Sequence, residues 1–242
     1  MKFTCLYAVS FLLIFLSGYV NAEVDFRTPE REYLNDRGSW NIYIEADMQR
    51  SNSALATKSL KKLKKTLADI ETKLPAHSIK KLKKLNIFLM WGEDSPKGGK
   101  KSGMRFVRKG ETKNRLHYDK RWENSVVIYS AENLIYLSEM WARKAVTHEL
   151  AHAWQIMHWP DRYDVIAAPW KLAKAKGLYT NVKDYKNRVK PRAYALKNNL
   201  EYFAELSAMY FVGGDYFPYD RARLSKYDPI GVKMVKKLWN VR

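Results

Sequence analysis

The chain has 242 residues, a formal net charge of +19 and a single cysteine, Cys5. This length suits one domain with a sizeable core, and one cysteine excludes an internal disulfide. The charge indicates an anionic partner (nucleic acid, acidic lipid or envelope polymer, or an acidic substrate), although a well-hydrated lysine surface explains it equally well.

The first 22 residues have the pattern of an export signal. Lys2 supplies a positively charged start, Leu6 to Leu16 is an apolar run, and Val20-Asn21-Ala22 resembles a cleavage site of small residues. The apolar run is short for a membrane span, and no later stretch is long enough to be one. We therefore predict cleavage after Ala22 and a secreted or periplasmic protein, a location that argues against nucleic acid as the partner. Because Cys5 leaves with the signal, the mature chain has no thiol for a lipid anchor or a nucleophile.

Residues 23–39 are polar and lack periodicity, so we interpret them as a lead-in segment and residues 40–242 as a single domain. Trp40 to Ala46 alternates and is rich in aromatic and β-branched residues, which is typical of a strand. Further strands are predicted over Asn86 to Trp91 and over Ser125 to Ser130.

Two lysine-rich amphipathic segments lie between the first two predicted strands. Ser53 is expected to cap the longer one, in which apolar residues recur every three or four positions, and Ile79 to Leu85 forms the shorter one. Such segments could bind a membrane surface or an acidic polymer, but a core-facing helix with a charged outer side is the commoner explanation. Their lysines are Lys58, Lys61, Lys62, Lys64, Lys65, Lys80, Lys81, Lys83 and Lys84.

The stretch Gly92 to Gly103 contains two adjacent glycines, Gly98 and Gly99, together with several lysines, which indicates a mobile loop. A phosphate-binding P-loop is excluded. That motif needs an additional glycine before its Gly-Lys pair, at the place that Asp94 occupies.

The segment Glu139 to Met157 is predicted to be helical and contains His148-Glu149-Leu150-Ala151-His152, the pattern H-E-x-x-H. Histidines four residues apart share one face of a helix, so their ring nitrogens can converge on one zinc ion. Glu149 projects from a neighbouring position, where a carboxylate can reach a metal-bound water without occupying the metal. An ordinary helix with polar positions is the alternative, but the chain has only five histidines with which to produce this spacing by chance.

The rest of the chain, from Asp164 onward, is predicted to be mainly helical. A chain in which the strands come first and the helices follow is typical of an α+β fold. The predicted helices cover Asp164 to Lys176, Asn199 to Val212 and Ile230 to Trp239.

A catalytic zinc ion takes three protein ligands, and His158 is one candidate for the third. It follows His152 by six residues, which is the spacing of the metzincin motif. Metzincins have a glycine three residues after the second histidine, where the chain leaves the helix, whereas Gln155 stands at that place here. If the helix continues, His158 lies about 9 Å along the axis from His152 and is rotated away from the metal. A histidine that interacts with the negative end of the helix dipole is the alternative explanation.

The second candidate is Glu201, with Glu205 four residues later on the same face of a largely apolar helix. Two like charges on a buried face are costly unless a metal or protonated ring nitrogens compensate them. We therefore expect Glu201 to bind zinc and Glu205 to accept the N–H of a ligating histidine. A solvent-facing acidic pair is the alternative.

The H-E-x-x-H pattern followed by Glu201-Tyr-Phe-Ala-Glu205 resembles the gluzincin metallopeptidases. More narrowly, it is similar to the catalytic domain of anthrax lethal factor and its secreted relatives. The similarity extends over residues 125–228 and is faint before Gly103. It implies a zincin-like α+β fold, in which a small N-terminal mixed sheet places an edge strand, here Ser125 to Ser130, beside the active-site helix. The C-terminal half would be mainly helical. In that family a tyrosine seven residues before the ligand glutamate helps to stabilise the transition state, and Tyr194 occupies this position.

The function that follows is an exported zinc-dependent endopeptidase. Zn²⁺ would lower the pKa of its bound water to roughly 7, Glu149 would act as general base, and Tyr194 would donate to the developing oxyanion. The substrate would be a peptide or protein, acidic in view of the chain's charge, and extended along Ser125 to Ser130. The alternative is a non-catalytic basic protein that binds anionic envelope polymers or lipid surfaces through the lysine-rich helices.

Overall fold

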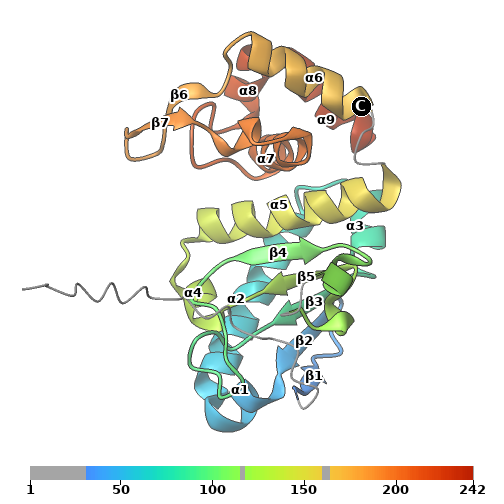
Figure 1. The fold of residues 1–242 in the computed structure, drawn as a ribbon, viewed down its shortest axis with the longest axis vertical. Helices are drawn as coiled ribbons and strands as arrows, with labels where there is room; N and C mark the ends of the chain where they lie inside the picture. Colours follow the sequence, from blue (N-terminus) through green and yellow to red (C-terminus); the bar gives the residue numbers. More distant parts are fainter. Residues whose placement is uncertain (1–30, 115–117, 160–163, 242) are drawn as a thin grey trace, which may run out of the picture.

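The computed structural model describes residues 31–114, 118–159 and 164–241 (Figure 1). The predicted export signal, residues 1–22, lies outside the described residues, as does the first part of the lead-in segment. Within the described ranges, no helix combines the length and the apolar character that crossing a membrane requires.

The fold is a mixed α+β fold, in which a small sheet is followed by a mainly helical half (Figure 1). The three central strands of the five-stranded sheet are parallel, and each outer strand is antiparallel to its neighbour. The central strands are rich in Ile, Val, Phe and Leu because they are covered on both faces. The strand order is β1 (Tyr33–Asn35), β2 (Asn41–Glu45), β3 (Asn86–Leu89), β5 (Ser125–Ile128) and β4 (Met104–Val107).

The edge strand beside the motif helix is β4, not the strand that begins at Ser125. We predicted the latter as the edge, and this was wrong, because β5 pairs with β3 on one side and with β4 on the other. The sequence of β4, Met-Arg-Phe-Val, has neither the apolar run of β3 and β5 nor a clear alternation of polar and apolar residues. The true edge strand therefore comes from a part of the chain to which the sequence assigned no element.

The lead-in segment also contributes to the sheet. Its residues Tyr33–Asn35 form β1, which pairs antiparallel with β2, and Arg31 is fully buried. The described part of this segment is therefore integral to the domain, whereas the sequence placed the start of the domain at Trp40. Three residues are too few for a strand pattern, and burial of an arginine depends on a partner, Glu45, that the local sequence does not reveal.

Helices α2 (Ser53–Glu71) and α5 (Glu139–His158) cover one face of the sheet and enclose the main hydrophobic core. The predicted cap of α2 is shifted by one residue, because the side chain of Asn52 accepts the hydrogen bond from the N–H of Leu55. The opposite face of the sheet carries a smaller, aromatic-rich cluster. The other helices described in this half are α1 (Ala46–Ser51), α3 (Ala76–Leu82) and α4 (Ala131–Tyr136), together with the 3-10 turns η1 (Glu111–Asn114) and η2 (Lys120–Trp122).

Several lysines of the two basic helices are engaged within the molecule. Lys62 donates to the carbonyl oxygen of Leu137, and ion pairs of 2.7 to 2.8 Å join Lys64 to Asp36, Lys65 to Glu139 and Lys83 to Glu71. The apolar positions of α2 face the core. These helices therefore use part of their charge to hold the fold together, which weakens the argument for a dedicated anion-binding surface.

The C-terminal half packs on α5 through α7 (Asn199–Phe211), with the other elements arranged around α7 (Figure 1). Trp154 of α5 stacks on Trp239 with ring centroids 5.2 Å apart, which fixes the end of the chain against the motif helix. The other elements are α6 (Asp164–Ala175), β6 (Thr180–Lys183), β7 (Val189–Arg192), the 3-10 turn η3 (Tyr194–Leu196), α8 (Arg221–Tyr227) and α9 (Pro229–Leu238).

Candidate metal centre

Helix α5 carries the H-E-x-x-H motif between the sheet and α7 (Figure 1). Its first turn is capped by the Ser138 side chain, which accepts from the N–H of Trp141, and Glu139 in that turn suits the positive end of the helix dipole. Helix α7 begins similarly at Asn198, whose side chain accepts from the N–H of Glu201. A capped first turn therefore holds Glu201 opposite the middle of α5.

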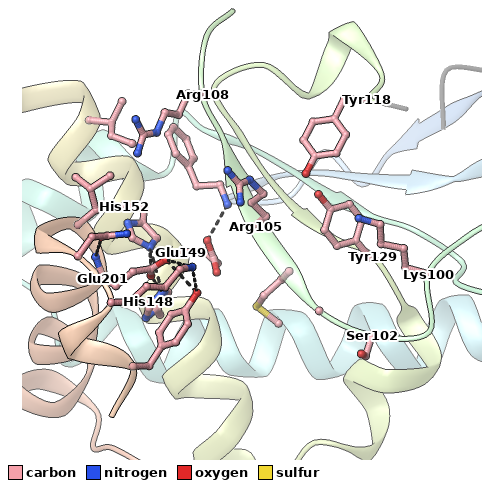
Figure 2. A pocket seen from close by; sticks show the side chains of 18 residues that line it. Lys100, Ser102, Arg105, Arg108, Tyr118, Tyr129, His148, Glu149, His152 and Glu201 are labelled. Atoms are coloured by element: carbon pink, nitrogen blue, oxygen red, sulfur yellow. Dashed lines mark hydrogen bonds and ion pairs between the residues drawn. The ribbon is translucent and has the colours of Figure 1, made fainter. Parts of the chain in front are cut away.

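His148, His152 and Glu201 converge on one point (Figure 2). The Nε2 atoms of the two histidines are 3.0 Å apart, and each lies 3.1 Å from Oε2 of Glu201. Among the residues that the structure describes, this is the one group of three or more His, Cys, Asp or Glu side chains whose geometry could hold a metal ion.

The cluster suits zinc in both chemistry and size. Two imidazole nitrogens and one carboxylate oxygen are a ligand set of catalytic zinc sites. A tetrahedral ion with bonds of about 2.0–2.1 Å separates its ligand atoms by about 3.3 Å, close to the distances found here. Only a slight opening of the triangle would be needed to admit the ion.

The cluster is also electrostatically prepared for a cation. Burial alone would favour neutral His148, but the carboxylates of Glu201 and Glu205 outweigh it and raise the pKa of His148 to about 10. Burial opposes ionisation of Glu201 too, yet hydrogen bonds from His148, His152 and Lys197 hold the pKa of its carboxyl well below the usual range. Without a metal, the carboxylates therefore keep a proton on His148, which a zinc ion would displace when it binds.

The other ring nitrogen of His148 faces a buried carboxylate. Nδ1 of His148 lies 2.8 Å from Oε1 of Glu205, a residue that is 1% exposed. Lys144 lies one turn before His148 on α5, with its Nζ 3.0 Å from Glu205 and 2.7 Å from Asp215. Although burial favours the neutral acid, Lys144 and then His148 lower the pKa of Glu205 to about 2. The carboxylate is thus available to fix the orientation and tautomer of the His148 ring.

Glu149 lies beside the cluster but does not belong to it (Figure 2). One of its carboxylate oxygens, Oε2, accepts a hydrogen bond of 2.7 Å from the backbone N–H of Phe106. Phe106 belongs to β4, so the edge strand holds the motif glutamate in place. This contact depends on a strand that the sequence did not predict.

Tyr194 reaches the cluster from η3. Its hydroxyl donates to Oε1 of Glu201 at 3.0 Å, and Nζ of Lys197 donates to both the Tyr194 hydroxyl at 2.8 Å and the same oxygen at 3.0 Å. Tyr194 is 46% exposed, so its hydroxyl stands where a bound molecule could meet it. Lys197 was not predicted, although its spacing of four residues from Glu201 on a helix start was a usable signal.

His158 lies away from the cluster. Helix α5 continues unbroken to this residue, and the His158 ring packs on Trp154 with centroids 4.2 Å apart. Burial, followed by the charge of Lys81, lowers its pKa. The structure thus brings Glu201, and not His158, to the two motif histidines.

Sequence reasoning missed Lys144 and Asp215. Lys144 was detectable in principle, because it falls on the face of His148 at a spacing of four. Asp215 gave no local signal, since it lies in the turn after α7 and meets Lys144 only through the tertiary fold.

The cluster opens into a cavity of about 490 Å³. Edge strand β4 and the loop before it form one wall, and η3 with the start of α7 forms the other. Besides the residues already described, the lining includes Lys100, Ser102, Arg105, Arg108, Tyr118 and Tyr129 (Figure 2). A comparison with protein-family models, with curated proteins and with solved structures finds no match for this chain.

Proposed function

We propose that the protein is a zinc-dependent endopeptidase of the gluzincin type, exported by its N-terminal signal. The observation that carries the proposal is the convergence of His148, His152 and Glu201 on one point, with Glu149 beside it and a cavity in front. The mixed sheet supports a zincin-like fold, since an antiparallel edge strand, β4, runs along the motif helix.

His148, His152 and Glu201 would hold the zinc ion, and Glu205 would orient His148 from behind. When bound, zinc acidifies a water molecule and polarises a carbonyl group. Glu149 takes the proton from the attacking water and delivers it to the leaving amine nitrogen. The N–H of Phe106 keeps the Glu149 carboxylate aimed at the cavity while it does so.

Tyr194 is the proposed donor to the oxygen that becomes negatively charged. Lys197 and Glu201 hold its hydroxyl at the cavity, and its single O–H would turn from Oε1 of Glu201 to the substrate oxygen. Lys197 adds a positive charge at the same place.

A peptide substrate would extend along β4. This strand is paired on one side with β5, and the N–H of Phe106 points to the cavity on the other side, toward Glu149. Because β4 is the last strand in the sheet order and the N–H of Phe106 stays on Glu149, an extended peptide would add to this edge through the other backbone groups of β4 and present its carbonyl groups to the cluster.

Zinc content per chain tests the ligand assignment. We expect one zinc ion per purified wild-type chain, loss of zinc in Glu201→Ala, and retention in the matched control His158→Ala. Loss of zinc in His158→Ala and not in Glu201→Ala would mean that His158 is the third ligand, as in the metzincin pattern. A zinc-free wild type that still binds polyanions would favour the non-catalytic basic protein.

Replacing the base tests the chemistry. Glu149→Gln should bind zinc like the wild type and lose about 10²- to 10⁴-fold in kcat, the usual contribution of a positioned base. Cleavage of an unfolded protein substrate, with and without a chelator, measures this. If Glu149→Gln turned over substrate at the wild-type rate, Glu149 would not be the general base.

A further inference from the structure

The surface formed by α6, α8 and α9 is strongly basic. Residues 165–183 contain four lysines and no acidic residue, and residues 221–241 contain six basic residues and a single acidic one, Asp228. Helix α6 packs against α9 and lies on the side of α7 that faces away from α5 (Figure 1). These helices therefore present positive charge away from the metal centre, where the proposed reaction does not use it.

Asp228 does not compensate this charge at the surface. Its side chain is almost fully buried, and Oδ2 accepts hydrogen bonds from the hydroxyl groups of Tyr179 at 2.9 Å and Tyr202 at 2.5 Å. Oδ1 accepts from the N–H of Gly231 at 2.8 Å, in the first turn of α9. The carboxylate is therefore used inside the protein, to hold the start of α9.

The lysines of this surface differ from those of α2. Lys64 and Lys65 of α2 form ion pairs within the molecule, as described above. By contrast, Lys176, Lys226 and Lys233 are exposed and make no ion pair with any residue in the described part of the chain. Their charges are therefore available to an external partner.

An exposed apolar patch lies between α6 and α9, around a hollow of about 70 Å³. Leu172 of α6 and Ile230 of α9 line the hollow and are 38% and 40% exposed. Exposed apolar residues that gather in one place, with polar residues around them, are typical of an interaction site. The apolar lining residues that form the patch are Pro169, Leu172, Leu178, Pro229 and Ile230.

The three lysines lie around this patch. Lys176 itself lines the hollow, and Lys226 is the neighbour of Tyr227, which also lines it. Lys233 follows Ile230 by three residues, so it lies one turn further along the same face of α9. We call the apolar patch together with these three lysines the lysine-rimmed patch.

The shape of the lysine-rimmed patch favours a lipid surface over a protein partner. Protein interfaces are centred on aromatic or arginine side chains that fill pockets. The hollow has the volume of only about two liquid water molecules at about 30 Å³ each, so it is too small for such a side chain. A bilayer needs no pocket, because apolar side chains enter its interface while lysines extend to the headgroups.

We propose that the lysine-rimmed patch docks the protein on the surface of a lipid bilayer that carries anionic headgroups. Leu172 and Ile230 would enter the interface, and the three lysines would pair with the headgroups. The hollow and the cavity of the metal centre share no lining residue, so docking does not itself occupy the metal centre. The inference does not depend on the proposed peptidase function.

Co-sedimentation with vesicles of phosphatidylcholine, with and without phosphatidylglycerol, tests the role of charge. We expect the wild type to bind only the vesicles that contain phosphatidylglycerol, and to be released from them by salt. A triple variant, Lys176→Gln, Lys226→Gln and Lys233→Gln, should lower the partition coefficient about 100-fold, since each lysine near an anionic surface contributes about fivefold.

A matched triple variant controls for net charge. Lys58→Gln, Lys61→Gln and Lys84→Gln remove the same charge from exposed positions on α2 and just after α3. Because these lysines lie outside the lysine-rimmed patch, the control should lower the partition coefficient by less than about threefold.

A pair of leucine variants tests the apolar contact. Leu172→Gln should lower the partition coefficient about fivefold, because a partly exposed leucine no longer transfers its side chain from water to the interface. Leu34→Gln is the control, since Leu34 of β1 is 45% exposed but lies outside the lysine-rimmed patch. It should bind vesicles like the wild type.

Three results would overturn the proposal. The first is a wild type that does not bind anionic vesicles at low salt, and the second is an equal loss in the two triple variants, which would assign binding to overall charge. The third is binding of soluble polyglutamate, without vesicle binding, that depends on the three lysines and would indicate an acidic protein partner. Vesicle binding needs neither zinc nor substrate, so these results are independent of any result on the peptidase.

Discussion

Two buried glutamates, Glu45 and Glu205, each hold one wall of the cavity, and they do so in different ways. Glu45 accepts from Arg31, from Ser95 and from the backbone N–H of Trp91, so its partners belong to the sheet and the loop. Glu205 lies between Lys144 and the ring of His148. Both are at most 1% exposed, so burial alone does not distinguish them.

The difference lies in what each carboxylate contacts next. The partners of Glu45 position backbone, whereas one partner of Glu205 is a side chain that also faces the cavity. A buried ion pair is thus evidence for a functional site only when one of its members reaches the site. Substitutions in the Glu45 network should therefore change stability and leave metal binding unchanged, whereas substitutions at Glu205 should change both stability and metal binding.

The largest effect is expected from Arg31→Ala. Removing the guanidinium leaves the Glu45 carboxylate buried without its counter-charge, which should lower the free energy of unfolding by about 3–5 kcal/mol. Denaturant unfolding followed by circular dichroism measures this, with exposed Arg37→Ala as the control. Zinc affinity of the folded protein should stay unchanged, and a loss of zinc comparable to that of Glu201→Ala would erase the distinction between the two networks.

The next effect concerns acid stability of the metal-free protein. The pKa of Glu205 is lowered from 4.5 to about 2 in the folded state, so its ionised form stabilises the fold above pH 4.5. This contribution, at most about 3 kcal/mol, should be lost as the pH falls from 4.5 toward 2. Unfolding free energies of wild type and Glu205→Gln, compared across this range, should converge at the acid end. If the two free energies of unfolding differed by the same amount at every pH in this range, folding would not lower the pKa of Glu205.

The smallest effect is expected on zinc affinity in Glu205→Gln. The amide no longer provides the negative charge that makes the His148 ring a more basic ligand and fixes its tautomer, so affinity should fall about 10- to 100-fold. Competition with a chromogenic chelator measures the change. Glu45→Gln serves as the paired variant, and equal affinity in the two would mean that Glu205 is only a structural counter-ion to Lys144.

Local patterns predicted the long helices well. Helix α5 was expected over Glu139 to Met157 and ends at His158, and α7 was expected to end at Val212 and ends at Phe211. Both have enough turns for the helical period to emerge from the sequence. The motif spacing also predicted which side chains of α5 and α7 would face each other.

Local patterns could not predict the edge strand β4 or the ion pairs between residues that are distant in the sequence. Strand β4 is as short as β3 and β5 but has an arginine between its apolar residues where they have an uninterrupted apolar run, and its place at the edge depends on the path of the whole sheet. The contacts of Arg31 with Glu45 and of Lys144 with Asp215 join positions that only the fold brings together. The metal ligands were therefore more predictable than the residues that hold the two walls.

Because Arg31 holds the loop in one wall of the cavity, the point at which the N-terminal segment is cleaved would affect that wall. A protease that trimmed the chain past Arg31 would remove none of His148, His152 and Glu201, yet it would release the carbonyl oxygens of Lys97 and Gly98 and loosen the loop that leads to Lys100. Two processed forms of the same gene product would then carry equal amounts of metal and differ in how firmly this wall of the cavity is held. N-terminal processing would therefore change the order of the cavity wall without changing the metal content of the protein.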